Sequence, residues 1–176
     1  MRRTWAIGAL VVSALAVASI ALASGLHHGH GRFGARMSGF NEVPPILSDG
    51  KASVRLTIND TSLTYQLTLS GTFSSTITQS HLHFAQPGVN GPVFLFLCTN
   101  LGNGPAGTPA CPQQGTVTRT VSAADLLPVP AQNVPAASYS SVLRILRSGD
   151  AYANVHTTKF PAGEVRGQVS VHFEHH

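Results

Sequence analysis

The sequence is short of charge, and this restricts the partners that it can have. Only 10% of its 176 residues are charged, and the lysines and arginines form no cluster. Domains that bind nucleic acids need such a cluster, so we expect no nucleic-acid partner. The sequence also lacks a GxSxG motif or any other context that would activate a nucleophile. We therefore expect no catalytic activity.

Cysteine is scarce as well. Cys98 and Cys111 are the two cysteines, and they bracket a loop rich in glycine and proline. Without a CxxC spacing, ligation of a metal by these residues is disfavoured. An isolated pair in an exported chain favours a disulfide instead. Closing so short a loop stabilises a fold by about 3 kcal/mol in the chain-entropy model.

One long apolar run is present, and it lies at the amino terminus. Arg2 and Arg3 precede an apolar stretch over residues 5–22. The small residues at positions 21 and 23 match the cleavage pattern of a signal peptide. We expect residues 1–23 to be removed and the protein to be secreted, periplasmic or held in the cell envelope. An uncleaved anchor is the alternative, because the run approaches the roughly 20 residues that cross a bilayer. A membrane is expected as a partner only through that uncleaved segment.

Residues 24–32 are expected to be a mobile, histidine-rich segment, followed by one domain over residues 33–173. His27, His28 and His30 are a weak candidate for metal binding, because such tracts bind metals. Cleavage after Ser24 would make His27 the third residue of the mature chain. The terminal amine, two backbone amides and the His27 imidazole could then form a square-planar copper site. The signal favours cleavage after Ala23, which loses that geometry. The alternative is that this tract, like HFEHH at the other end, is a solvated tail.

The domain itself shows the pattern of many short β-strands. Residues 51–60 and 62–71 alternate apolar and polar side chains, and the turn-forming residues between them predict a hairpin. Near residues 138–148 the apolar period becomes helical, with Gly149 as the expected C-cap. This pattern predicts an all-β sandwich or Greek-key barrel with one short helix. The other expected strands cover residues 80–84, 92–97, 115–122, 151–157 and 163–173.

Three stretches together resemble the chordin-domain (CHRD) family. They are SGFNEVPPI at residues 38–46, SHLHF with GVNGPVFLFL within residues 80–97, and GDAYANVHTTKFPAGEVRGQV at residues 149–169. The resemblance implies an immunoglobulin-like or superoxide-dismutase-like Greek-key sandwich, and it implies no established enzymatic activity. The motif residues to which we assign a structural role are Glu42, Pro44, Pro45, Asn90, Gly91, Asn154, Glu164, Arg166 and Gly167.

Some of these residues carry more definite expectations. Pro44 and Pro45 predict an extended edge or loop, because proline cannot donate to a β-ladder. Glu42 is expected to pair with Arg166, and ligation of a cation is the alternative. Glu164 and Arg166 are expected on the polar face of the last strand, paired with neighbouring strands. Gly167 suggests a bulge or a close approach of two backbones.

The most chemically distinctive feature is the histidine pair in SHLHF. In a strand, His81 and His83 project to one face while Leu82 and Phe84 project to the other, so the histidines should point outward or into a groove. Tyr152, Asn154 and His156 share a face of a later strand in the same way. If the two strands are neighbours, His156 completes a three-histidine site, and imidazole suits copper or zinc. The alternative is hydrogen bonding to backbone or to Asn90, Asn154 and Glu164, as half-buried polar groups require.

Three functions fit these observations. The preferred one is a non-catalytic binding module whose partner is an unknown protein or envelope component. The second is a copper- or zinc-binding protein that uses His81, His83 and His156. The third is a purely structural envelope component, which needs no site.

Overall fold

The computed structural model describes residues 31–171, so the expected signal peptide, His27, His28, His30 and the last five residues lie outside the described part. Within residues 31–171 the fold contains nine strands and one α-helix, with three short 3-10 turns at Gly39–Asn41, Ala123–Asp125 and Pro130–Gln132. The helix α1 is Tyr139–Ser148. The strands are β1 Gly31–Ser38, β2 Asp49–Ile58, β3 Leu63–Thr72, β4 Ile77–Phe84, β5 Val93–Thr99, β6 Gly115–Val121, β7 Ala151–Thr157, β8 Val165–Gln168 and β9 Ser170–Val171.

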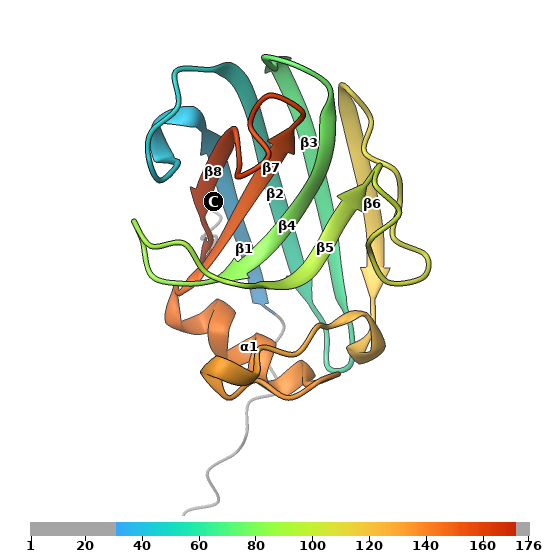
Figure 1. Ribbon diagram of the computed structural model, residues 1–176. Helices are drawn as coiled ribbons and strands as arrows, with labels where there is room; N and C mark the ends of the chain where they lie inside the picture. Colours follow the sequence, from blue (N-terminus) through green and yellow to red (C-terminus); the bar gives the residue numbers. More distant parts are fainter. Residues whose placement is uncertain (1–30, 172–176) are drawn as a thin grey trace, which may run out of the picture.

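The strands form one antiparallel sheet that folds over into two layers. Their order is β5-β4-β7-β8-β1-β2-β3-β6, and β9 adds to β1. β8 joins β1 through a single residue pair, Ser38 with Arg166, and Figure 1 shows β4, β5 and β7 crossing in front of β1, β2 and β3. The Tyr65 hydroxyl in β3 donates to the Leu97 carbonyl in β5 across the interior. The predicted all-β sandwich is therefore confirmed, while its Greek-key connectivity stays a prediction.

The hairpin of β2 and β3 forms as its alternation predicts. Val54 pairs with Leu67, Leu56 with Tyr65, and all four side chains are buried. The Asn59 N–H donates to the Ser62 carbonyl and closes the turn. Because alternate residues of both strands face the same core, the register places every apolar side chain inside.

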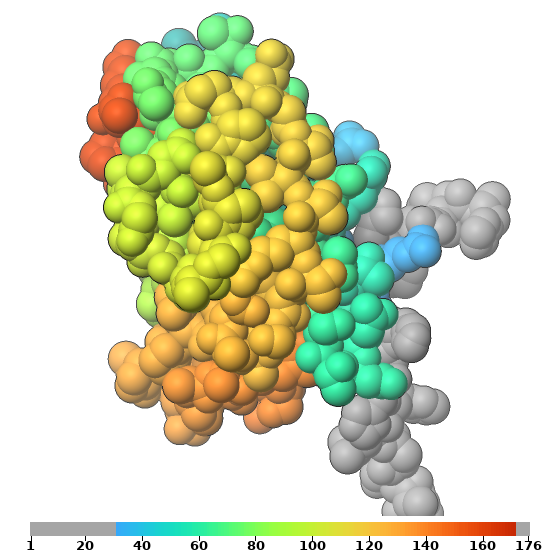
Figure 2. Space-filling view, turned by 90° about the vertical axis from the view of Figure 1, so that its right-hand side faces the viewer, coloured from blue at the N-terminus to red at the C-terminus, as the bar shows by residue number. Residues whose placement is uncertain are grey.

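The helix also lies where its periodicity predicts. Ser138 caps its first turn by accepting from the Ser141 N–H, and Gly149 ends it in the left-handed conformation at φ 80°. Val142, Ile145 and Leu146 are its buried residues. In the side view of Figure 2, the orange segment that includes α1 closes the lower end of the sandwich. No helix among residues 31–171 is long and apolar enough to cross a membrane.

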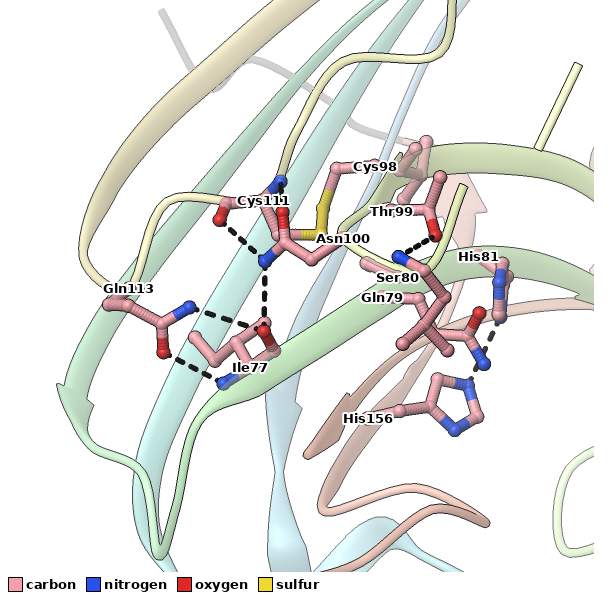
Figure 3. The surroundings of a disulfide bond; sticks show 12 residues. Ile77, Gln79, Ser80, His81, Cys98, Thr99, Asn100, Cys111, Gln113 and His156 are labelled. Carbon is pink, nitrogen blue, oxygen red and sulfur yellow. Dashed lines mark hydrogen bonds between the residues drawn. A yellow bond between two sulfur atoms is a disulfide. The ribbon is translucent and has the colours of Figure 1, made fainter. Parts of the chain in front are cut away.

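The predicted disulfide between Cys98 and Cys111 is present. Asn100, inside the loop that it closes, donates to the carbonyls of Ile77 and Cys111 and accepts from the Cys111 N–H. Figure 3 shows this arrangement against the start of β4. The disulfide loop is thereby tied to the strand that carries His81, and a disulfide is consistent with an extracellular location.

Candidate metal centre

β4 and β7 are neighbours, so the third histidine lies beside the first two. In their antiparallel register His81 is opposite Asn154, His83 is opposite Tyr152, and Gln79 is opposite His156. All these side chains except that of Gln79 are buried. Figure 3 shows the His81 and His156 rings facing each other, joined by a dashed line. The juxtaposition that the metal hypothesis requires is therefore present.

The three rings converge closely. His81 Nδ1 lies 3.1 Å from His156 Nε2. One ring nitrogen from each of His81, His83 and His156 lies within 4.8 Å of the others. No other group of three or more histidine, cysteine or acidic residues within residues 31–171 meets this test. The convergence comes from two strands only, which makes it a property of the sheet register rather than of loop conformation.

The histidines do not point outward to solvent, which is one of the two placements expected for them, the other being a groove. His81, His83 and His156 are only 3%, 7% and 6% exposed. The Phe96 ring of β5 packs edge-on against His81 at 4.3 Å, and the Tyr152 ring stacks on His83 at 4.5 Å. Strand alternation separates the two faces correctly, but other segments cover the second face as well.

Two backbone carbonyls determine which nitrogen of two of the rings carries hydrogen. His83 Nδ1 lies 2.8 Å from the Gly91 carbonyl oxygen, and His156 Nδ1 lies 2.9 Å from that of Pro161. Because a carbonyl only accepts, both Nδ1 atoms are donors and both Nε2 atoms of the neutral rings carry lone pairs. Fixing ring orientation and tautomer through the outer nitrogen is the usual arrangement of metal-binding histidines.

Burial keeps the rings neutral. Burial, reinforced by the neighbouring His156 and His83, lowers the pKa of His81 to about 2. Burial lowers the pKa of His83 to about 4, against the opposing effect of its hydrogen bond to Gly91. The pKa of His156 is also lowered by burial. At neutral pH all three rings are unprotonated and can act as metal ligands.

Asn154 lies between the two Nε2 atoms. Its side-chain Oδ1 position is 3.0 Å from His83 Nε2 and 2.9 Å from His156 Nε2. Both Nε2 atoms are acceptors, so hydrogen-bonding chemistry requires the amide NH₂ at this position, donating to both rings. The amide and a metal ion would use the same lone pairs. His81 Nε2, in contrast, is buried without a partner.

Arg166 supports the site from behind. Its guanidinium lies 3.4 Å from the Tyr152 ring centroid, on the ring that stacks against His83. It donates to Asn90 Oδ1 and to the carbonyls of Gln86 and Val89, which holds the loop that ends at Gly91. Arg166, expected to pair with neighbouring strands on the polar face, is instead held by this loop and is only 2% exposed.

The expected ion pair between Glu42 and Arg166 is also wrong. Glu42 is 6% exposed, its Oε1 has no hydrogen-bond partner, and no ion pair joins it to Arg166 among the described residues. Burial raises the pKa of Glu42 to about 7, although a backbone hydrogen bond at Val43 and the charge of Arg166 oppose the shift. Gly163 packs on this carboxyl, where a Cβ atom would overlap Glu42 Oε1 and approach Asn154 Nδ2 to 3.0 Å.

The comparison with known families agrees with this fold. Residues 33–169 match the CHRD domain family, and the match covers most of the chain. The chain belongs to the CHRD domain family. No curated protein and no solved structure matches it. All three converging histidines lie within the matched part of the CHRD domain, whereas His27, His28 and His30 lie before it.

The other motif residues of the CHRD domain have structural roles. Glu164 is fully buried, not on a polar face as expected, and accepts hydrogen bonds from the Ser48 hydroxyl, the Ser74 N–H and the Thr157 hydroxyl. A Cβ atom on Gly167 would overlap the Arg36 carbonyl oxygen, so the expected close backbone approach is confirmed. Pro44 and Pro45 are exposed in the loop after the first 3-10 turn.

Three contributors to the site have no specific sequence signal. In the sequence, Phe96 is one apolar residue among several in a strand that is expected to be buried. The carbonyls of Gly91 and Pro161 are backbone atoms, which any residue type supplies. The glycines and prolines around Gly91 and Pro161 predict turns beside the strands that carry the histidines. They do not show where the carbonyl groups point.

Proposed function

We propose that this CHRD domain is a non-catalytic binding module that holds one first-row transition metal ion, copper or zinc, through His81, His83 and His156. The observation that carries the proposal is the convergence of three neutral imidazoles, two of which have their tautomers set by carbonyls. Neutral imidazole nitrogen is a good ligand for both metals.

The spacing of the nitrogens supports the proposal. Two nitrogens bonded to one metal at about 2.0–2.1 Å are about 3.3–3.6 Å apart at tetrahedral or trigonal angles. The 3.1 Å between His81 Nδ1 and His156 Nε2 is close to this value. Because His156 Nε2 is an acceptor, His81 Nδ1 donates in this contact, so His81 has to take the tautomer protonated at Nε2 before its Nδ1 can bind a metal ion. The upper limit of 4.8 Å for the full set means that the longest separation needs to shorten by about 1.5 Å at most.

A purely structural role is the competing explanation. The Asn154 amide already satisfies two of the ring nitrogens, and buried polar groups need such partners. That explanation leaves His81 Nε2 unsatisfied in the interior, which costs about 1–3 kcal/mol. The two roles differ in whether a metal ion displaces the Asn154 amide from these ring nitrogens, and the titration below tests this.

We propose that the domain acts after export, outside the cytoplasm. The disulfide and the apolar amino terminus support this location, since disulfides persist in oxidising compartments. Mass spectrometry of the amino terminus of the mature protein tests it. An intact chain beginning at Met1 in the cytoplasmic fraction would contradict it, whereas an intact chain in the membrane fraction would indicate the uncleaved anchor.

The metal proposal is tested with a background variant. Six of the nine histidines lie outside residues 31–171 and would bind metal adventitiously, so they are replaced by alanine in the otherwise complete chain. The positions are His27, His28, His30, His172, His175 and His176. Titration with copper or zinc should then give one site per chain. Cobalt loading should give the visible spectrum of a nitrogen-liganded ion.

His156→Gln and His83→Gln, each in that background, serve as the comparison. Each removes one ligand and should weaken binding by at least about 100-fold, since a metal with two remaining ligands is poorly held. Circular dichroism and the melting temperature identify any variant that fails to fold. Unchanged binding in both folded variants, or loss of all binding in the background variant, would contradict the proposal.

A further inference from the structure

We infer that the site is built for a cuprous ion in preference to zinc or cupric copper. The inference rests on the proposed metal-binding function and specifies the ion. It comes from the charge of the ligands, the charge around them and the number of donors.

The ligand set carries no negative charge. The three converging atoms are imidazole nitrogens, and no carboxylate or thiolate of the described residues belongs to the group. Both cysteines are in the disulfide. The Glu164 carboxylate is already engaged by Ser48, Ser74 and Thr157. A bound ion would therefore keep its full formal charge.

The surroundings oppose positive charge. The rings are 3–7% exposed, and Phe96 and Tyr152 cover them with aromatic surface. Arg166, the cation on the far side of Tyr152, adds a positive field. The Glu42 carboxyl offsets this field only in part, because burial raises its pKa to about 7. The free energy of transferring an ion from water to such a place rises with the square of its charge, and its repulsion from Arg166 rises in proportion. A monovalent ion therefore has a large advantage over a divalent one.

The number of donors points the same way. Zinc is usually four-coordinate in proteins, and cupric copper prefers a tetragonal arrangement. Here β4 and β7 supply three nitrogens, and the groups packed on them include the Phe96 ring. Zinc also has a filled d shell, so the difference lies in charge and in the number of ligands: three imidazoles suffice for the monovalent cuprous ion, whereas zinc needs a fourth donor.

Asn154 provides a decisive substitution. Its side chain is within 3.0 Å of two of the ring nitrogens, so Asn154→Asp places a carboxylate beside a bound ion with almost no change of shape. The added anion should favour zinc over the cuprous ion. Asn154→Gln keeps the amide neutral and serves as the control for disturbed packing.

The experiment measures both affinities in the background variant that lacks the six terminal histidines. Cuprous affinity is measured without oxygen against a chromogenic cuprous chelator, and zinc affinity against a chromogenic zinc chelator. We expect cuprous binding to be at least 100-fold tighter than zinc binding. In Asn154→Asp this ratio should fall at least tenfold, and in Asn154→Gln it should not fall.

The outcomes separate the two proposals. Zinc binding as tight as cuprous binding, with His156→Gln abolishing both, overturns the cuprous preference and leaves the metal site intact. An unchanged ratio in Asn154→Asp also overturns the preference, because it removes the charge argument. Absence of any metal binding that depends on His156 overturns both proposals.

Discussion

At the scale of single residues, the molecule contains two buried carboxyl groups with opposite electrostatic environments. Glu164 is surrounded by donors and Glu42 Oε1 has none. Although burial alone raises the pKa of Glu164, the hydrogen bonds from Ser48, Ser74 and Thr157 lower it, and the net shift is downward. The pKa of Glu42 rises to about 7, mainly through burial. Each residue therefore predicts a distinct pH dependence of folding.

Glu164→Gln should destabilise the fold by about 1–3 kcal/mol at pH 7, because hydrogen bonds to a charged acceptor are lost. The lowered pKa means that Glu164 stabilises the protein above its ordinary value of 4.5, and this stabilisation is lost as the pH falls towards the folded-state value. Urea unfolding at pH 7 and at pH 3 measures the effect. The difference between variant and parent should shrink at the lower pH, and a constant difference would contradict this account.

Glu42→Gln should act in the opposite direction. A raised pKa means that the folded state binds a proton more tightly than the unfolded state, so the protonated carboxyl favours folding below pH 4.5. That contribution is lost as the pH rises through about 7. The variant, which mimics the neutral carboxyl, should be about 1–3 kcal/mol more stable than the parent at pH 8.5 and equal to it at pH 4. Urea unfolding at both values checks this, and lower stability of the variant at pH 8.5 would refute it.

At the scale of elements, the junction between β8 and β1 closes the sheet onto its second layer. A single residue pair joins the two strands there, and Gly167 packs directly on the Arg36 carbonyl. A side chain at position 167 would push the two backbones apart. The junction carries Arg166, so its geometry also determines how the site is supported.

Gly167→Ala should therefore destabilise the fold by about 2–4 kcal/mol, within the range of overpacking in a close-packed interior. Gly88→Ala is the control, because Gly88 has open space around it and a positive φ of 75°, so that only backbone strain of about 1 kcal/mol applies. Thermal and urea unfolding measure both. Equal effects of the two substitutions would show that the close approach is not important.

At the scale of the whole molecule, the site joins segments that are far apart in the chain. His81 and His83 lie on β4, while His156 lies on β7, more than 70 residues later. A metal held by both strands binds the folded chain and not the unfolded one. Binding should therefore stabilise the fold by mass action.

Cuprous ion at about 100 times its dissociation constant should stabilise the fold by about 2.7 kcal/mol. For a domain of this size, that corresponds to a rise in melting temperature of roughly 5–11 °C. His156→Gln should show no rise in the same background. Anaerobic thermal unfolding with and without the ion gives the answer, and a rise of equal size in the variant would place the bound ion elsewhere.

Local patterns in the sequence are sufficient to specify the strands, the helix and the pairing of neighbouring strands. Alternation in β2 and β3, the turn between them, the cap at Gly149 and the spacing of the two cysteines are local signals, and each acts within a few residues. Alternation also placed His81 and His83 on one face of β4. These features are predictable because their physical causes are short in range.

The groups that pack on that face of β4 depend on long-range contacts, which no local pattern specifies. The neighbour of β4 is β7, which comes from the far end of the chain. The Phe96 and Tyr152 rings pack on the histidines that alternation alone would leave exposed. Burial then keeps the histidine rings neutral and raises the pKa of Glu42. Glu42 Oε1 has no hydrogen-bond partner in this interior. Desolvation depends on everything that surrounds a group, and the surroundings of His81 come together only when the chain has folded.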